Sequence, residues 1–428
     1  MNYQETIEYL FNSTPVFEKI GAKAYKPGIH TTEELDEHFG HPHRHFKTIH
    51  IAGTNGKGSC SHTIAAILQA QGYKVGLYTS PHLVDFRERI RVNGKCIPEK
   101  YVIDFVEQER NYFEPLHCSF FELTTALAFK YFAEEKVDIA VIEVGLGGRL
   151  DCTNIINPIL SIITNISLDH TQFLGNTLAE IAYEKAGIIK GETPVVIGED
   201  LPETRPVFEK VANERNAPII FAQDSKHQEI LTAVHENGIM IYETKSWGKL
   251  KGELCGDYQA KNLNTILNAI NYLSSQEVHI LKDKASVEKG ISEVCKQTGL
   301  MGRWQKISES PLVICDTGHN VGGWQYLAPQ IKSQPCKQLR IVFGMVDDKD
   351  VLTVMKMLPK DAIYYWTQAT TKRAINVEKI AELGSTLGLS GTSYPSVRKA
   401  FSAAQKEASA EDFIFVGGSS YVVADFLS

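Results

Sequence analysis

The feature that most constrains this chain is an apolar run that breaks into a glycine-rich loop containing one lysine. The run is Ile49–Ala52, and the loop that follows is Gly53-Thr54-Asn55-Gly56-Lys57-Gly58-Ser59. The next residues, Cys60–Gln71, have the apolar spacing of a helix. A strand, a glycine loop and a helix in this order hold phosphate, because backbone N–H groups and the helix N-terminus point at the anion. We therefore predict a nucleoside triphosphate site, with Lys57 as the cation and the Ser59 hydroxyl as a magnesium ligand.

This loop departs from the general phosphate-loop pattern at both ends. The pattern has glycine where Ile51 stands and a serine or threonine where Gly58 stands. The alternative interpretation is an ordinary strand-to-helix turn with a surface lysine. Three glycines alternating with Asn and Lys directly after a strand are not typical of a simple connection, and they favour the phosphate site.

The composition narrows the class of protein. A chain of 428 residues is long enough for two or three domains. A net charge of −7 without a basic stripe argues against nucleic acid or a membrane surface as a partner. The eight cysteines include no Cys-x-x-Cys pair, which favours reduced thiols over disulfides or zinc. Because the sequence shows no signal peptide and no apolar stretch of membrane-spanning length, we expect a cytoplasmic protein.

Apolar runs alternate with helical patterns along the chain, which predicts an α/β fold with a mostly parallel sheet. In the first part we expect strands at Thr48–Ala52, Lys74–Tyr78, Asp138–Val144, Ile159–Thr164 and Pro194–Ile197. A hairpin turned on Asn-Gly is expected within 89–97, an irregular β section over 229–243 and a helix over 262–273.

A glycine-containing break near 296–303 indicates a domain boundary. It predicts a phosphate-loop, nucleotide-binding domain over residues 1–296 and a smaller Rossmann-like α/β domain over residues 297–428. The strands expected in the second domain are Leu312–Cys315, Leu339–Gly344, Ala362–Trp366 and Asp412–Val416.

A carboxylate, Glu143, ends the predicted strand at 138–144. Ligand sites of open α/β sheets lie at the carboxyl ends of strands, and Mg²⁺ prefers hard oxygen ligands that it shares with phosphates. The alternative is a glutamate that ends the strand in solvent without a function, but the glycines over 145–148 argue against this alternative. These glycines do not form a dinucleotide fingerprint, because Leu150 stands where the last glycine is required.

Two further polar residues follow predicted strands. His170 comes after the strand at 159–164, and Ser80 comes after the strand at 74–78. Taken singly, each fits a structural role. Since the carboxyl ends of parallel strands share one edge of a sheet, both are candidate metal ligands beside Glu143.

Three further charged residues have ordinary structural interpretations. Lys185 closes a predicted helix, where a lysine ordinarily compensates the helix dipole in solvent. Asp316 follows the strand at 312–315 and could accept hydrogen bonds from a ribose, and Arg303 could neutralise the charge of a phosphate. Either of the last two equally suits an interdomain salt bridge.

Five motifs, in this order, resemble those of the folylpolyglutamate synthase/dihydrofolate synthase family, a relative of the muramyl peptide ligases. They are Gly53–Ser59, Tyr78–His82, Glu143–Asp151, Leu168–Thr171 and Glu184–Ile188. Gly256–Gln259 with Asn262, and Gly302-Arg303, extend the match across the predicted boundary. The resemblance covers nearly the whole chain, most weakly over 200–250 and 375–410. It also accounts for the glycine between the lysine and the hydroxyl of the loop.

The resemblance implies an ATP-dependent, ADP-forming amide ligase that uses Mg²⁺. The γ-phosphoryl group would pass to a pterin-borne carboxylate, and the amine of glutamate would attack the resulting acyl phosphate. The implied small-molecule substrates are dihydropteroate, folates and L-glutamate, and the family is typically monomeric.

Residue roles follow from the resemblance position by position. ATP would be bound by Gly53, Thr54, Asn55, Gly56, Lys57, Gly58, Ser59, Asn262, Arg303 and Asp316. The metal ligands would be Ser59, Ser80, Glu143 and His170. The pterin would lie near Phe121, Leu150, Asp151 and Cys152. The groups acting in catalysis would be Lys57, His170 and Lys185. The last resembles a carbamylated lysine of the family, whose formation requires a neutral amine and hence a lowered pKa.

We predict both activities, dihydrofolate synthesis and folate polyglutamylation, because the segments 150–152 and 81–91 better resemble a dihydropteroate-using enzyme. The alternatives are a monofunctional folylpolyglutamate synthase and a muramyl-peptide-type ligase. A regulatory GTPase would need an Asn-Lys-x-Asp segment, which the chain lacks. The failed glycine fingerprint disfavours a nicotinamide dehydrogenase.

Overall fold

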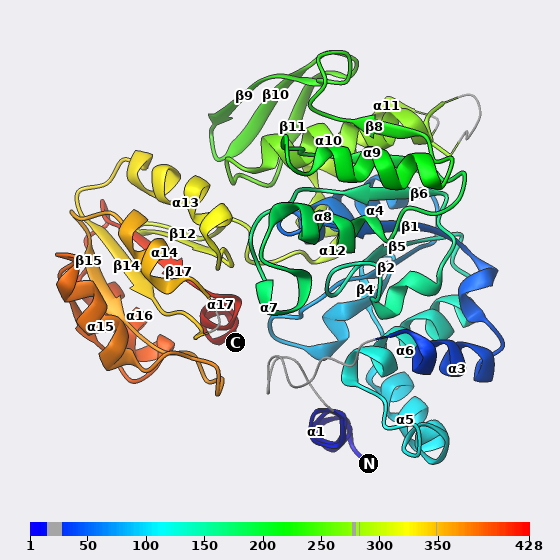
Figure 1. Ribbon diagram of the computed structural model, residues 1–428. Helices are drawn as coiled ribbons and strands as arrows, with labels where there is room; N and C mark the ends of the chain where they lie inside the picture. Colours follow the sequence, from blue (N-terminus) through cyan, green and yellow to red (C-terminus); the bar gives the residue numbers. More distant parts are fainter. Residues whose placement is uncertain (15–27, 276–279, 282, 348) are drawn as a thin grey trace. The chain divides into compact units, whose positions relative to one another are not determined.

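The chain folds into two compact units. The computed structural model describes residues 1–14, 28–275, 280–281, 283–347 and 349–428. The first unit comprises Met1–Glu253 and Gln259–Leu300, and the second comprises Leu254–Tyr258 and Met301–Ser428 (Figure 1). The short segment Leu254–Tyr258 therefore leaves the first unit and belongs to the second, which no pattern in the sequence indicated.

An eight-stranded sheet forms the centre of the first unit, in the order β4-β3-β2-β5-β1-β6-β7-β8. The strands are β1 (Lys47–Ala52), β2 (Val75–Tyr78), β3 (Ile90–Val92), β4 (Lys95–Cys96), β5 (Ile139–Glu143), β6 (Leu160–Ile163), β7 (Val195–Ile197) and β8 (Ile219–Phe221). Six of them run parallel, and the β3–β4 hairpin forms an antiparallel edge. The expected strands and the hairpin on Asn93-Gly94 are confirmed, whereas β8 was not predicted.

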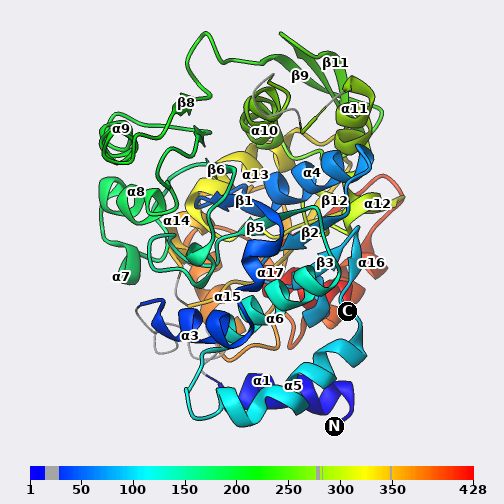
Figure 2. The same cartoon turned by 90° about the vertical axis from the view of Figure 1, so that its right-hand side faces the viewer.

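Helices cover both faces of this sheet. They are α1 (Tyr3–Ser13), α3 (His30–His38), α4 (Lys57–Ala70), α5 (Glu99–Phe113), α6 (Phe120–Glu134), α7 (Thr171–Leu174), α8 (Leu178–Ala186), α9 (Arg205–Glu214), α10 (Gln259–Leu273), α11 (Lys284–Ser292) and α12 (Val294–Thr298), with short 3-10 turns η2 (Pro42–His45), η3 (Phe86–Arg89) and η4 (Cys152–Ile155). Figure 2 shows α4 and α6 on opposite sides of the central strands. The core beside α6 is aromatic and aliphatic, and it includes Tyr78, Phe129 and Ile142.

A separate three-stranded antiparallel sheet packs against α10 and α11. Its strands are β9 (Ile230–Glu236), β10 (Ile239–Thr244) and β11 (Gly248–Gly252). They correspond to the irregular β section expected over 229–243, which extends further along the chain than predicted.

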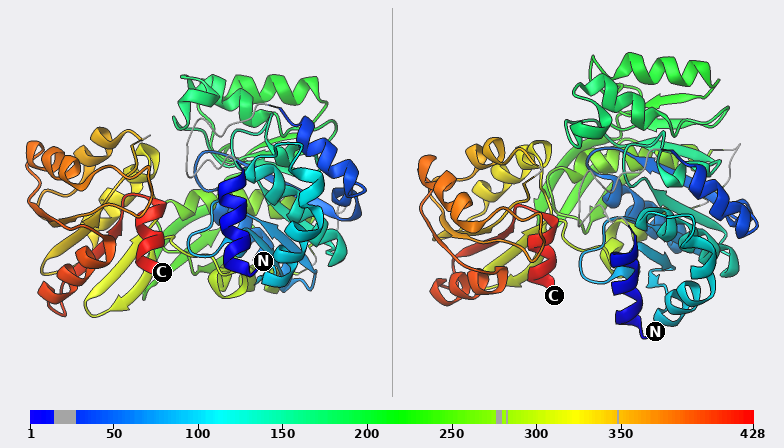
Figure 3. Two further views of the ribbon diagram at one scale, coloured as in Figure 1. Left: turned by 90° about the horizontal axis from the view of Figure 1, so that it is seen from below. Right: turned by 60° about the horizontal axis from the view of Figure 1, so that its bottom comes forward.

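The second unit contains a six-stranded sheet in the order β12-β13-β17-β14-β15-β16. The strands are β12 (Gln305–Glu309), β13 (Leu312–Asp316), β14 (Leu339–Phe343), β15 (Ile363–Trp366), β16 (Gly391–Ser393) and β17 (Phe413–Gly417), and the helices are α13 (Val321–Ser333), α14 (Val351–Met357), α15 (Val377–Thr386), α16 (Val397–Glu407) and α17 (Ser420–Leu427). Only β12 is antiparallel, and in Figure 3 the strands of this unit lie between its helices. The α/β fold of both units is confirmed, although β12 and β16 were not predicted.

Among the helices of the described residues, none combines the length and the apolar character needed to cross a bilayer.

Candidate functional site

The glycine loop connects β1 directly to α4. The helix begins at Lys57, three residues before the predicted start at Cys60, so the loop lysine is its first residue. Gly53 and Gly56 have φ values of 148° and 84°. A Cβ at Gly53 would lie 1.8 Å from Thr164 Oγ1, and one at Gly56 would lie 2.3 Å from Asn262 Oδ1. Both positions therefore require glycine, because the backbone turns there in close contact with its neighbours.

Two residues after β6 hold the loop in shape. Thr164 Oγ1 donates to the Asn55 carbonyl at 2.6 Å, and Asn165 Oδ1 accepts from the Asn55 N–H at 2.9 Å. The Thr54 N–H donates to the Asn165 carbonyl at 2.9 Å. Neither residue was among the predicted site residues, although a polar pair directly after an apolar strand could have identified them.

Two lysines converge on one carbonyl of the loop. Lys57 Nζ donates to the carbonyls of Gly53 and Thr54 at 3.2 and 3.3 Å. Lys185 Nζ, from the last turn of α8, donates to the same Gly53 carbonyl at 2.8 Å. The loop therefore places two lysine amino groups side by side at a helix N-terminus, where the charge of Lys57 and the helix N–H groups favour an anion.

The environment of Lys185 differs from that of a solvated helix end. Its side chain is only 4% exposed. Burial, followed by the charge of Lys57, lowers the pKa of Lys185 to about 7, although Asp169 and Asp151 act in the opposite direction. A large fraction of the amine is thus neutral near pH 7, and a neutral amine is the form that reacts with CO₂.

Glu143 lies at the carboxyl end of β5, next to the strand that leads into the loop. It is 4% exposed, and its Oε2 accepts a hydrogen bond from the Ser80 N–H at 3.3 Å. In the register of the sheet, Glu143 pairs with Ile51 of β1. The structure thus brings two of the predicted metal ligands into contact at the edge where the loop begins.

A Mg²⁺ ion suits this set of donors. Within the described part of the chain, no group of three or more His, Cys, Asp or Glu side chains is arranged to hold a metal. Mg²⁺ does not require such a cage, because it usually takes one or two carboxylates and completes its shell with water and phosphate oxygens. The buried Glu143 carboxylate provides a donor of this type beside the loop.

Ser59 and Asn262 are held beside the loop by α10. Ser59 is buried in the first turns of α4, and its Oγ accepts a hydrogen bond from Gln259 Nε2 at 3.1 Å. Asn262 Nδ2 donates to Gln259 Oε1 at 2.9 Å. Gln259 thus links a predicted metal ligand to a predicted ATP contact, and α10 begins at this residue, three residues before the predicted start at 262.

His170 precedes the short helix α7, with its backbone in the left-handed region at φ 50°. Its Nε2 lies 3.9 Å from Asp169 Oδ1. Asp169 in turn acts electrostatically on Lys185, so the 168–171 segment lies near the buried amine.

The predicted pterin contacts gather around the segment after β5. A Cβ at Gly145 would lie 2.4 Å from the Phe121 ring, which fixes the backbone against that aromatic side chain. Asp151 is buried, and its oxygens accept from the backbone N–H groups of Leu146 at 2.9 Å and Thr153 at 3.0 Å. Leu150 and Cys152, on either side of it, are half-buried. Asp151 therefore shapes the segment from within, and its flanking residues form the accessible part.

In the second unit, Asp316 is a buried organising residue at the end of β13. It is 2% exposed and accepts hydrogen bonds from the Tyr258 hydroxyl, the Trp304 N–H and the Gly318 N–H at 2.7, 2.7 and 2.8 Å. Burial raises the pKa of Asp316, whereas the charge of Arg303 lowers it. Asp316 thus holds the segment that carries Arg303.

The structure brings most of the predicted ATP, metal and catalytic residues of the first unit together around the glycine loop. The group around the loop contains Gly53, Thr54, Asn55, Gly56, Lys57, Gly58, Ser59, Ser80, Glu143, Asp151, Lys185 and Asn262. Arg303 and Asp316 belong to the second unit. They are close to each other, and their part in binding ATP remains a prediction.

Comparison with known proteins agrees with this architecture. Residues 51–270 match the Mur ligase middle domain, and residues 302–420 match the Mur ligase glutamate ligase domain. Together with the glycine loop and the two α/β units, these matches define a two-domain ligase of the Mur type.

Relatives that match most of this chain specify the family. The dihydrofolate synthase/folylpolyglutamate synthase of Bacillus subtilis is 36% identical over 344 residues, covering 78% of this chain and 79% of that protein. A Haloferax volcanii protein named probable bifunctional folylpolyglutamate synthase/dihydropteroate synthase is 31% identical over 444 residues. This match covers 99% of the chain, but the chain spans only 50% of that longer protein.

Solved structures lead to the same family. Escherichia coli FolC in complex with DHPP and ADP has a TM-score of 0.84 and 31% identity, covering 100% of this chain and 97% of that one. The bifunctional folylpolyglutamate synthase/dihydrofolate synthase of Yersinia pestis, complexed with AMPPNP and a Mn ion, has a TM-score of 0.82 and 28% identity, with coverages of 100% and 97%. The chain belongs to the folylpolyglutamate synthase/dihydrofolate synthase family, and it is an enzyme of the ADP-forming ligase type.

Proposed function

We propose that this chain joins L-glutamate to dihydropteroate and to folates, using ATP and Mg²⁺ and releasing ADP and phosphate. The observation that carries the proposal is the convergence of Lys57 and Lys185 on the Gly53 carbonyl at a helix N-terminus, in a chain of this family. A carboxylate becomes a good electrophile only when one of its oxygens is part of a leaving group. Phosphorylation supplies that group, and the amine of glutamate then displaces phosphate to form the amide.

The residues of the loop would bring two anions together. Lys57 would leave the carbonyls of Gly53 and Thr54 and neutralise charge on the transferred phosphoryl group. Bound Mg²⁺ supplies further charge neutralisation, and Ser59, Ser80, Glu143 and His170 would hold it. Asn262, Arg303 and Asp316 would position the nucleotide.

Lys185 would act after reaction with CO₂. Its neutral amine would attack CO₂ and lose a proton, which gives an anionic carbamate that could help to hold the metal. The lowered pKa of Lys185 supports this proposal, because it provides the neutral amine near pH 7.

The pterin part of the substrate would lie along Phe121, Leu150, Asp151 and Cys152. Both activities would use this surface, because dihydropteroate and folates share the pterin group and differ beyond it. The resemblance of the 150–152 segment to dihydropteroate-using enzymes supports the bifunctional form.

A panel assay of ADP release tests these proposals. We expect turnover with dihydropteroate plus glutamate and with a reduced folate plus glutamate, and none with a UDP-linked muramyl substrate. Turnover of the reduced folate but not of dihydropteroate would indicate a monofunctional folylpolyglutamate synthase. Turnover of the muramyl substrate alone would overturn the folate assignment.

We also propose a cytoplasmic monomer that does not bind nucleic acid. All eight cysteines are free thiols, and the net charge is −7. Light scattering coupled to gel filtration should give a mass near that of one 47.7 kDa chain, and a dimer mass would contradict the monomer.

A further inference from the structure

His50 is a buried histidine in the strand that leads into the glycine loop. It lies within β1, its side chain is fully buried, and its Nε2 lies 2.8 Å from Thr153 Oγ1 of η4. Burial, with a smaller contribution from the charge of Lys190, lowers the pKa of His50 to about 3. The imidazole is therefore neutral, and one of its two nitrogens carries a single proton.

The hydrogen bonds of Thr153 determine which nitrogen that is. Thr153 Oγ1 donates its only proton to Asp151 Oδ1. It must then accept at its contact with His50, so Nε2 carries the proton and Nδ1 does not. Within the residues that the structure describes, His50 Nδ1 is buried without a hydrogen-bond partner. The three side chains thus form a chain of hydrogen bonds with one direction: His50 donates to Thr153, and Thr153 donates to Asp151.

This chain ends at the residue that shapes the segment after β5. Asp151 Oδ1 accepts from both the hydroxyl and the N–H of Thr153, and Oδ2 accepts from the Leu146 N–H. A hydroxyl that accepts a hydrogen bond becomes a better donor, so His50 strengthens the bond from Thr153 to Asp151. The orientation of Asp151 thus depends on a side chain of the strand that also carries the phosphate loop.

A role in stability alone does not account for His50. A buried ring nitrogen without a partner is unfavourable, and an apolar side chain of similar size would avoid this penalty. What an apolar side chain lacks is the donor toward Thr153. A histidine at this position provides the donor, although its Nδ1 is left without a hydrogen-bond partner.

We propose that His50 is a positioning residue for the pterin substrate, acting through Thr153 to fix Asp151 and the segment 146–152. This inference rests on the proposed function, because it takes that segment as the pterin contact. His50 does not touch substrate, and its removal should weaken pterin binding without affecting ATP.

Steady-state kinetics of His50→Leu and Thr153→Val test the proposal. Each variant should raise the KM for the pterin substrate about tenfold, because Thr153→Val removes the side-chain hydrogen bond to the charged Asp151 and His50→Leu removes the bond that orients it. The KM for ATP and the melting temperature should stay near the wild-type values. The double variant should be no worse than either single variant, because both remove the same chain of hydrogen bonds.

Two conservative variants serve as matched controls. Gln at position 50 retains an N–H₂ donor toward Thr153, and Thr153→Ser retains the hydroxyl. We expect His50→Gln and Thr153→Ser to keep a KM within about threefold of the wild type. Equal losses in His50→Gln and His50→Leu would overturn the proposal, as would a parallel rise in the KM for ATP. If His50→Leu does not fold, the Thr153→Val and Thr153→Ser pair decides the matter.

NMR of protein labelled with ¹⁵N-histidine separates failure of this inference from failure of the proposed function. The His50 ring, assigned by its loss in His50→Gln, should show a protonated Nε2 and an unprotonated Nδ1 down to pH 5. The opposite tautomer would overturn the donor chain whatever the substrate is. If the wild type turns over no pterin while the tautomer is as expected, the proposed function fails and the effect on pterin binding fails with it.

Discussion

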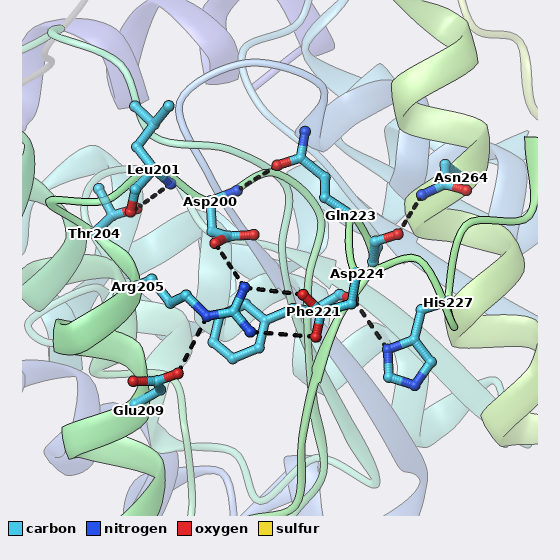
Figure 4. Close-up of polar contacts among 11 residues, drawn as sticks. Asp200, Leu201, Thr204, Arg205, Glu209, Phe221, Gln223, Asp224, His227 and Asn264 are labelled. Carbon is cyan, nitrogen blue, oxygen red and sulfur yellow. Dashed lines mark hydrogen bonds and ion pairs between the residues drawn. The ribbon is translucent and has the colours of Figure 1, made fainter.

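Two cationic clusters in the first unit are built in opposite ways. At the start of α9, the Arg205 guanidinium lies 2.9 Å from Asp224 and 3.2 Å from both Asp200 and Glu209, and 3.9 Å from the centroid of the Phe221 ring (Figure 4). Three carboxylates thus neutralise one cation.

The pair at the glycine loop lacks this compensation. Among the described residues, Lys57 and Lys185 form no ion pair, and their ammonium groups donate to the carbonyls of Gly53 and Thr54. A neutralised cation holds a helix to a strand, whereas the Lys57 cation, without an ion pair and beside helix N–H groups, forms a site for an anion. Charge alone therefore does not mark a functional site. A cation that a shaped loop holds without an ion-pair partner is the better indicator.

The largest effect should come from removing the loop cation. Lys57→Ala should lower kcat by about 10³-fold, because the phosphoryl group then lacks a charge positioned for its transfer. Arg205→Ala is the matched control, since it removes a cation of the same unit, and it should leave kcat within about twofold. ADP release and a thermal melt would be measured for both proteins. Wild-type turnover by a folded Lys57→Ala enzyme would exclude the phosphate-loop role.

Lys185→Ala should have the second largest effect, a loss of about 100-fold in kcat, because an anionic group facing the metal would be absent. Formate or acetate added to this variant should restore part of the activity by entering the space that the side chain leaves. The same salts added to Lys57→Ala should restore nothing, since that variant lacks a cation. A Lys185→Ala enzyme with the kcat of the wild type would exclude a role for a Lys185 carbamate.

The lowered pKa of Lys185 also predicts a pH-dependent stability. Lys185 has a pKa of about 7 in the folded state and an ordinary value of 10.5. Between these values the unfolded chain binds the extra proton, so the free energy of unfolding should rise with pH, by at most about 1.4 kcal/mol per pH unit. Below pH 7 both states are protonated and the slope from this group vanishes.

Urea unfolding from pH 6.5 to 9.5 in CO₂-free buffer would measure this slope. The comparison variant is Lys185→Met, which keeps an unbranched side chain of similar length without a titratable group. The wild type should gain stability relative to this variant as the pH rises. Parallel curves for the two proteins would show that the amine is not held in a neutral form.

The contrast between the clusters also explains what the sequence could predict. Gly53 and Gly56 were predictable, because their conformations exclude other residues and the pattern around Lys57 is local. Glu143 was predictable as well, since it ends a continuous apolar strand. Local patterns carry these features and the positions of most strands along the chain.

Other features depend on contacts between distant segments. Thr164 and Asn165 hold the loop from more than 100 positions away, and nothing next to Lys57 in the sequence indicates this contact. The neutral amine of Lys185 follows from burial that only the packed α8 provides. Likewise, Leu254–Tyr258 is a short segment without a breaker pattern of its own, and its place in the second unit emerges only from the fold.

The smallest effect should come from the neutralised cluster. Arg205→Gln should lower the free energy of unfolding by about 1 kcal/mol, since exposed ion pairs and a cation over an aromatic ring each contribute little. Arg205→Lys, which keeps the charge but loses the planar fork over Phe221, should fall between the wild type and Arg205→Gln. Urea unfolding at low and high salt would resolve the three proteins, and their stabilities should converge at high salt as the ion pairs are screened. A loss of turnover in Arg205→Gln at unchanged stability would contradict the comparison, because a cation with three carboxylate partners would then have a part in the reaction.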